Sequence, residues 1–178
     1  MDALPPQVLP HRAAIIREAQ FRFGIPAPAA LIAAQLQQES NFDPSARSRV
    51  GAMGMGQFMP QTAKWVGAEL KGEAAPLDAG WSIRATVYYM RWLYDRVIYP
   101  ADCDRFGAAL SSYNGGLGWH NKRRAAAPAP NDFWGSVRHI NPGISAGNQK
   151  ENAEYPHRIV YDRQARFRAL GGRLVCIA

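Results

Sequence analysis

The sequence has little cysteine and contains no apolar run long enough to cross a membrane as a helix. Its 178 residues include two cysteines, Cys103 and Cys176, and neither has a cysteine or histidine at metal-ligand spacing. This argues against a zinc site, and no cofactor or metal is expected. The sequence also lacks an internal repeat, a strong strand pattern and a recognisable nucleic-acid-binding motif, so nucleic acid is not an expected partner.

The N-terminus lacks an export signal. The first 14 residues contain one acid, Asp2, and three prolines, but no apolar core of signal-peptide length. We therefore expect synthesis in the cytoplasm without a signal peptide. Cys103 and Cys176 are compatible with one disulfide that ties down the C-terminal tail, but free buried thiols are expected in a chain without an export signal.

The chain carries a net charge of +7, with 47% hydrophobic and 20% charged residues. This composition is ordinary for a globular protein, and the length fits a single domain over residues 1–178 with a sizeable core. The basic balance favours polyanionic partners, and charge alone does not choose among them.

Hydrophobic periodicity predicts a mainly α protein. Asp78 and Asp104 are candidate helix caps, and Gly24 ends the first helix. Residues 122–150 are rich in alanine, glycine and proline, which predicts a long irregular loop with a short helical turn near Trp134. The helices are expected at about residues 8–23, 26–38, 60–70, 81–97, 105–112 and 155–170.

Glu39 is the main candidate for chemistry. It follows Ile32 and Leu36 at helical spacing, so it extends a face that should point into the core. Partial burial raises the pKa of a carboxyl group, which lets it hold a proton near neutral pH and donate it. The alternative is a solvated residue in the last turn of a helix, and spacing alone does not decide between the two.

A glycine-rich segment follows Glu39. Gly51, Gly54 and Gly56 allow positive φ angles and close approach of a ligand to the backbone. Gln57 then offers amide donors and an acceptor, and Pro60 fits the first turn of a new helix. The alternative is an ordinary connection between two helices.

Three motifs in this order resemble those of the soluble lytic transglycosylase catalytic domain, which has a lysozyme-like fold related to goose-type lysozyme. The resemblance spans residues 32–160. The chain departs from the family pattern at Met55-Gly56 and at Pro156. The motifs are Glu39-Ser40-x-Phe42 with the glycine segment up to Ala63, then Ser112-Tyr113-Asn114-Gly115-Gly116, and finally Glu151 with Tyr155.

The resemblance implies a lysozyme-like domain with a substrate groove that cleaves peptidoglycan between N-acetylmuramic acid and N-acetylglucosamine without water. It implies one catalytic carboxylate, Glu39, which acts first as acid and then as base. Asp43 precedes Pro44 and is expected to be a turn residue instead of a second carboxylate. The resemblance also implies substrate-binding or site-organising roles for Ser48, Gln57, Met59, Tyr113, Asn114, Glu151 and Tyr155.

Two alternatives stay open at this point: a hydrolytic goose-type muramidase, and a non-catalytic glycan-binding module. We expect a monomer that reaches the periplasm or cell wall by phage lysis, as part of a virion or through a secretion system, as a phage endolysin would. The basic C-terminal helix, with Arg158, Arg163, Arg166 and Arg168, is a candidate contact with anionic envelope components.

Overall fold

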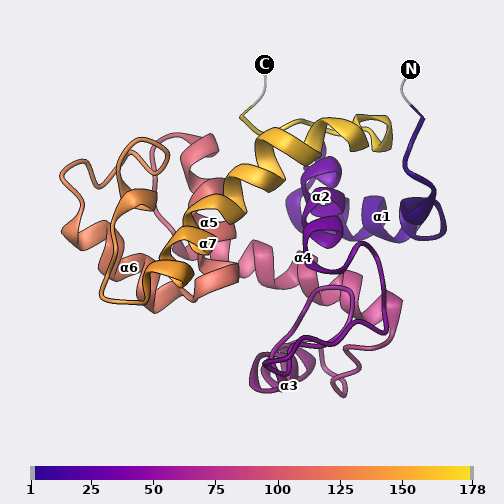
Figure 1. Cartoon of the computed structure of the whole chain (residues 1–178). Helices are drawn as coiled ribbons and strands as arrows, with labels where there is room; N and C mark the ends of the chain where they lie inside the picture. Colours follow the sequence, from indigo (N-terminus) through magenta and orange to yellow (C-terminus); the bar gives the residue numbers. More distant parts are fainter. Residues whose placement is uncertain (1–2, 177–178) are drawn as a thin grey trace. The chain divides into compact units, whose positions relative to one another are not determined.

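The computed structural model describes residues 3–176, and these residues are mainly helical (Figure 1). Within that range no β-strand forms, and only the isolated bridges Arg47–Met53 and Met53–Phe58 occur. The mainly α prediction is therefore confirmed. The α-helices are α1 (Arg12–Phe23), α2 (Ala29–Ser40), α3 (Pro60–Glu69), α4 (Ala79–Arg96), α5 (Asp102–Gly115), α6 (Leu117–Ala126) and α7 (Ala146–His157).

The chain forms two compact units, whose boundary falls within α4, between Tyr89 and Met90. The first unit runs up to Tyr89 and also includes Arg163–Leu174. The second runs from Met90 to Asp162 and includes the C-terminal segment from Val175.

Helix α2 is the centre of the first unit. Every residue of α2 from Ala29 to Leu36 is buried, because the helix is covered by α1 and by the 3-10 helix η4 (Gln164–Leu170). Such burial needs small and apolar side chains on all faces, which the alanine-rich sequence supplies. The helix thereby provides a fixed support for Glu39 at its end.

Helix α5 has the same role in the second unit. Its residues from Phe106 to Ser112 are all buried, and α6 and α7 pack against it. Close packing is possible at Gly107, where an added Cβ would lie 2.4 Å from the Phe133 ring. Helix α5 thereby supports Tyr113 and Asn114 in its last turn.

Several predicted elements have different bounds. The first helix begins with a 3-10 turn, η1 (Pro6–His11), and α2 begins at Ala29 and extends to Ser40. The predicted loop over 122–150 is shorter, because α6 extends to Ala126 and α7 begins at Ala146. A 3-10 turn, η2 (Val137–His139), does lie near Trp134.

The last predicted helix also differs. It begins at Ala146 and contains Pro156, passes into a π-helical turn, η3 (Arg158–Arg163), and ends as the 3-10 helix η4.

Asp78 caps α4 as predicted, since its carboxylate accepts a hydrogen bond from the Trp81 backbone N–H at 2.6 Å. The prediction for Asp104 is wrong. Helix α5 begins before it, and its carboxylate instead accepts hydrogen bonds from the backbone N–H groups of Phe133 and Trp134. Asp104 therefore holds the loop between α6 and α7, a contact that local sequence does not reveal.

The expectation of free thiols is also wrong. Cys103 and Cys176 form a disulfide across a sequence separation of 73 residues. The bridge lies within the second unit and ties the C-terminal segment to the first turn of α5.

The helices among the described residues are all too short or too polar to cross a membrane.

Candidate active site

Glu39 lies in the last turn of α2 and is half-buried. The helix ends directly after it, because Asn41 adopts a left-handed conformation with φ of 53°. The Asn41 N–H donates to the Gln37 carbonyl at 3.0 Å, which closes the helix. A carboxyl group is thus placed at the end of a buried helix, where the backbone turns away.

The glycine segment is folded against this same helix end. The Ser40 hydroxyl donates to the Met55 carbonyl at 2.9 Å, and the Gly56 N–H donates to the Ser82 hydroxyl of α4 at 2.9 Å. Met53 and Phe58 exchange two backbone hydrogen bonds of 2.9 Å. These bonds fix the loop beside the turn that carries Glu39.

Gly54 is required for this fold. Its φ is +76°, and an added Cβ would lie 1.6 Å from the Pro76 carbonyl oxygen. Only glycine avoids both the strained backbone and the collision. Gly51 also has positive φ, at +91°, but an added Cβ there would meet no atom within 4 Å.

Ser48 and Gln57 bond within the loop itself. The Ser48 hydroxyl accepts from the Ala52 N–H at 2.9 Å, and the Gln57 amide nitrogen donates to the Gly54 carbonyl at 2.9 Å. The amide oxygen of Gln57 takes no part in these bonds. Met59 is 45% exposed just before α3, so its thioether lies on the surface of the first unit.

Asp43 is a turn residue, as expected. Its carboxylate accepts hydrogen bonds from the Ser45 hydroxyl at 2.6 Å and the Ser45 N–H at 2.8 Å. The Ser45 hydroxyl, and then its N–H, lower the pKa of Asp43. The hydrogen bonds of the Asp43 carboxylate are therefore made within its own turn.

In the second unit, Tyr113 and Asn114 lie in the last turn of α5, where Tyr113 is half-buried and Asn114 exposed. Buried Asn152 of α7 connects this end of α5 to α7. Its amide nitrogen donates to the Ser111 carbonyl and to the Asn114 side-chain oxygen, both at 2.9 Å, and its oxygen accepts from the Ser111 hydroxyl at 2.8 Å.

Asn152 was not predicted from the sequence, where the available signal was its position directly after Glu151. In the structure, an added Cβ on Gly115 would lie 2.5 Å from the Asn152 side-chain nitrogen. Glycine at this position lets the end of α5 approach α7.

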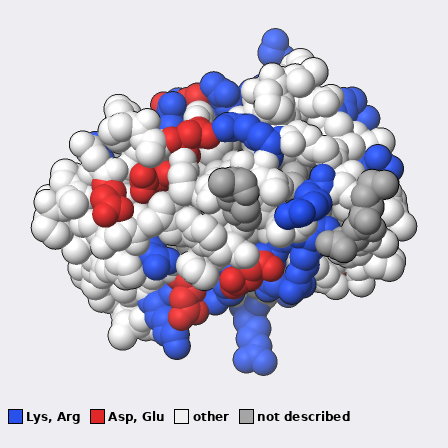
Figure 2. Space-filling model, turned by 90° about the horizontal axis from the view of Figure 1, so that it is seen from above, with Lys and Arg blue, Asp and Glu red and all other residues white. Residues whose placement is uncertain are grey.

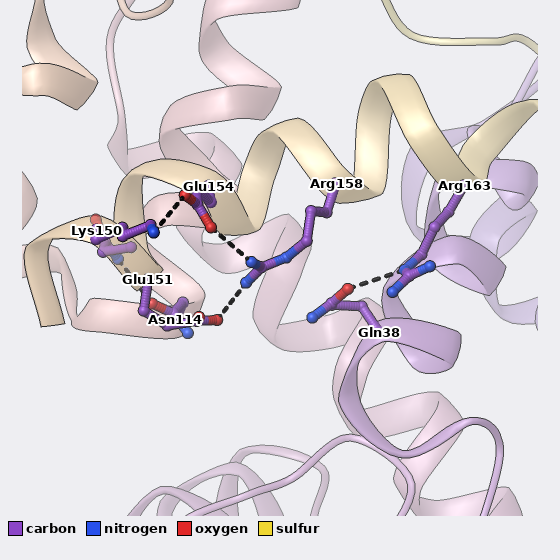
Figure 3. Close-up of polar contacts among 8 residues, drawn as sticks. Gln38, Asn114, Lys150, Glu151, Glu154, Arg158 and Arg163 are labelled. Atoms are coloured by element: carbon purple, nitrogen blue, oxygen red, sulfur yellow. Dashed lines mark hydrogen bonds and ion pairs between the residues drawn. The ribbon is translucent and has the colours of Figure 1, made fainter. Parts of the chain in front are cut away.

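Glu151 and Tyr155 both lie in α7 but have different surroundings. Tyr155 is 2% exposed, whereas the Glu151 carboxylate is at the surface and accepts from the Arg158 guanidinium at 2.5 Å. Arg158 also pairs with Glu154 at 3.0 Å, so its guanidinium lies between two carboxylates (Figure 3). Figure 3 also shows Arg163, whose guanidinium donates to the Gln38 side chain at 2.8 Å within the first unit.

The predicted residues therefore fall into two groups, one in each unit. The first comprises Glu39, Ser48, Gln57 and Met59, and the second comprises Tyr113, Asn114, Glu151 and Tyr155. No cluster of three or more histidine, cysteine, aspartate or glutamate side chains that could hold a metal ion occurs among residues 3–176.

Comparison with known proteins identifies the family. Residues 14–133 match the family described as "Transglycosylase SLT domain". The chain belongs to this family. The matched residues include Glu39, the glycine segment and the Tyr113-Asn114 motif, which confirms the resemblance drawn from the sequence motifs.

Curated relatives of this SLT domain are much longer than the chain. Membrane-bound lytic murein transglycosylase F from Shewanella frigidimarina is 32% identical over 128 residues, which cover 70% of the chain and 26% of the relative. The protein of the same name from Vibrio vulnificus is 36% identical over 121 residues, covering 63% of the chain and 21% of the relative. The chain thus spans about a quarter of the length of these relatives.

Solved structures establish the fold. The 70 kDa soluble lytic transglycosylase from Escherichia coli matches 94% of the chain, and 26% of its own, with a TM-score of 0.65 at 20% identity. An inactive mutant of lytic transglycosylase Slt from Pseudomonas aeruginosa, in which a glutamate is replaced by glutamine, matches 93% of the chain and 25% of its own, with a TM-score of 0.63 at 24% identity. The SLT domain is therefore lysozyme-like, as expected.

Proposed function

We propose that this SLT domain is a peptidoglycan lytic transglycosylase that cleaves the β-1,4 bond between N-acetylmuramic acid and N-acetylglucosamine and leaves 1,6-anhydromuramyl ends. The observation that carries the proposal is the position of Glu39, a half-buried carboxyl group at the end of buried α2, beside a hydrogen-bonded glycine loop. The names of the curated relatives support the same reaction, since each is a lytic murein transglycosylase.

In the proposed reaction, protonated Glu39 gives its proton to the glycosidic oxygen, and the bond from that oxygen to muramyl C1 breaks. The muramyl N-acetyl oxygen stabilises the positive charge that develops at C1. The Glu39 carboxylate then takes the proton of the muramyl C6 hydroxyl, whose oxygen forms a bond to C1. Glu39 ends protonated, and no water is consumed. A single carboxyl group can serve both steps, because it begins and ends the cycle protonated.

The other family-motif residues would bind the substrate. Met59 is exposed and would line a sugar subsite, while Tyr113 and Asn114 would flank the reacting ring. Ser48 and Gln57 would contact the substrate N-acetyl group or peptide. Their bonds within the loop support a further role, which is to hold the loop in shape.

Glu151 and Tyr155 would organise the site. The ion pair of Glu151 with Arg158 supports a positioning role over nucleophilic attack, because the guanidinium holds the carboxylate in place.

The proposed place of action is the periplasm or cell wall. The disulfide supports this, because disulfides persist in oxidising compartments. Delivery by phage lysis, by a virion or by a secretion system remains part of the proposal, as does a monomeric state.

A contact with anionic envelope components would involve Arg166 and Arg168. Both are exposed, whereas Arg158 and Arg163 bond within the chain. On the face shown in Figure 2, basic and acidic side chains lie next to one another, so the net charge of +7 is not gathered into one patch there.

The test is the release of soluble muropeptides from purified sacculi by the wild type and by Glu39→Gln. Glutamine keeps the size of the side chain but has no proton to donate, so the rate should fall by about 10²- to 10⁴-fold. Glu73→Gln, which changes an exposed acid of the same unit, is the matched control and should retain the wild-type rate. Equal rates for wild type and Glu39→Gln would show that another group catalyses the reaction.

A further inference from the structure

Arg123 of α6 is a fully buried cation without a carboxylate partner. Its side chain is 0% exposed, and its Nε and Nη2 atoms both donate to a single oxygen, that of the Gln149 amide, at 3.2 and 3.1 Å. None of the ion pairs among residues 3–176 includes Arg123. Burial lowers the pKa of Arg123, but a guanidinium still carries its charge at neutral pH.

One donor group of Arg123 is unsatisfied. The Nη1 atom is buried and has no hydrogen-bond acceptor within the described part of the chain. Burying a charged donor without a partner is costly, and buried charges are ordinarily paired. The arrangement is explained if an anion binds beside Nη1.

Arg123 lies in the wall of a cavity of the second unit. Its volume is about 320 Å³, and its lining includes Arg123, Gly115, Trp119 and three asparagines, Asn114, Asn148 and Asn152. The Nη1 atom lies 3.8 Å from the position that a Cβ on Gly115, another residue of the lining, would take, so the unsatisfied donor lies directly behind this part of the cavity wall. The space is within the size range of small-ligand sites.

The charges around the cavity favour an anion. Glu151 also lines it, but its carboxylate forms an ion pair with Arg158 (Figure 3), and Glu154, the second carboxylate on Arg158, also pairs with Lys150, so that two cations balance the two carboxylates. The Lys122 ammonium lies 4.1 Å from the centre of the ring of Trp119, which lines the cavity, and adds positive charge nearby.

The lining favours a carboxylate within a peptide. One guanidinium N–H group suits a single carboxylate, whereas phosphate sites generally use several positive groups or a row of backbone N–H groups. Asparagine amides can donate to and accept from peptide groups, and Ile144 and Trp119 provide apolar walls for a side chain.

We infer that this cavity binds a carboxylate of the peptide stem of peptidoglycan, with Arg123 Nη1 as its charged donor. The inference rests on the proposed function and extends it, because it assigns part of the substrate specificity to the stem as well as to the sugars. The link to the sugar-binding residues is Asn114, which lines the cavity and belongs to the family motif.

The first experiment measures binding without catalysis. The full chain is titrated with a soluble stem tripeptide carrying free carboxylates and with the same peptide fully amidated, and chemical shifts are followed by NMR. We expect Arg123→Met to weaken binding of the free acid by about tenfold or more, as for loss of a charge-assisted hydrogen bond. The guanidinium of the neighbouring Arg124 bonds to Pro130 and Asn131 outside the cavity. Arg124→Met should therefore change the affinity for the free acid by less than about twofold.

Because Arg123 is buried, a second variant tests the cavity without disturbing the core. Asn148→Asp places a negative charge on an exposed lining residue in the first turn of α7, where helices tolerate acids. It should weaken binding of the free acid but not of the amidated peptide, and Asn121→Asp on exposed α6 surface is its control. Equal binding of the free acid and the amidated peptide to the wild type would overturn the inference.

The second experiment compares initial cleavage rates on peptide-bearing strands and on strands freed of peptide, whose lactyl carboxylates are exposed. Arg123→Met should lower the ratio of these two rates by about tenfold. A fall of both rates by the same factor would overturn the inference, because it would indicate a structural role or binding of the lactyl carboxylate. If the wild type cleaves neither strand, the proposed function fails, and the peptide titration still decides the inference.

Discussion

At the scale of single residues, His120 is the clearest case of burial changing chemistry. It is 1% exposed in α6, its Nε2 lies 3.2 Å from the Tyr99 hydroxyl, and its Nδ1 has no hydrogen-bond partner among the described residues. Burial, and then the charges of Arg123 and Arg124, lower the pKa of His120 from 6.5 to about 4. The folded protein therefore keeps this histidine neutral.

This predicts a loss of stability in mild acid. The unfolded chain takes up a proton on His120 near pH 6.5, whereas the folded chain resists until about pH 4, so stability is full above pH 6.5 and falls as the pH drops toward 4. We expect this residue alone to lower the free energy of unfolding by about 2 to 3 kcal/mol between pH 7.5 and 4.5.

Urea unfolding at the two pH values measures this effect. His120→Gln should flatten the dependence by that amount, while His139→Gln, at an exposed histidine, should leave it as in the wild type. An unchanged slope in His120→Gln would contradict the assignment.

Single residues also differ in how well their roles could be predicted from the sequence. The spacing of Glu39 with Ile32 and Leu36 placed it on the core-facing side of its helix, because helical periodicity is a local property, but it left burial and solvation as alternatives; the structure shows that Glu39 is half-buried. Asn152 and Arg123 were not found, because their importance depends on contacts with residues 41 and 26 positions away in the chain. Their sequence context alone is that of ordinary polar helix residues.

At the scale of elements, the loop between α2 and α3 depends on its glycines to different degrees. Gly54→Ala should lower the free energy of unfolding by about 3 kcal/mol or more, because its Cβ would collide with the backbone of residue 76 and its φ is positive. Gly51 also has a positive φ, but an added Cβ there would meet no atom within 4 Å. Gly51→Ala should therefore lower the free energy of unfolding by only about 1 kcal/mol. Thermal or urea unfolding of both variants checks the difference, and equal losses would show that the collision is relieved by movement of the loop.

The disulfide predicts a second effect at this scale. Crosslinking a 73-residue loop restricts the unfolded chain, which corresponds to about 4 kcal/mol of stability in the chain-entropy treatment. Reduction should therefore lower the free energy of unfolding of the wild type by about 2 to 4 kcal/mol. A reductant should have no effect on Cys176→Ser, which serves as the control. Insensitivity of the wild type would mean that the bridge does not constrain the unfolded state.

Elements were predicted best where a local signal marks their ends. Pro60 at the start of α3, Gly24 at the end of α1 and Asp78 before α4 all act through neighbouring backbone atoms. Residues 146–154 of α7 were missed, because their polar sequence has no apolar stripe. The disulfide was missed for the same kind of reason, since the return of the chain to α5 is set by tertiary packing.

At the scale of the whole molecule, the chain combines a known family and fold with a proposed reaction. Family membership and the lysozyme-like fold are established, while the reaction is a proposal for a chain that covers about a quarter of its curated relatives. The central claim is that bond cleavage is completed by the muramyl C6 hydroxyl and not by water. A goose-type muramidase would share the fold but differ in this step.

Digestion of sacculi in H₂¹⁸O with the wild-type chain, followed by mass spectrometry of the released muropeptides, tests this claim directly. We expect muramyl ends that lack one water and carry no ¹⁸O, and we expect these products to disappear with Glu39→Gln. Reducing muramyl ends labelled with ¹⁸O at C1 would contradict this claim and would identify a hydrolase.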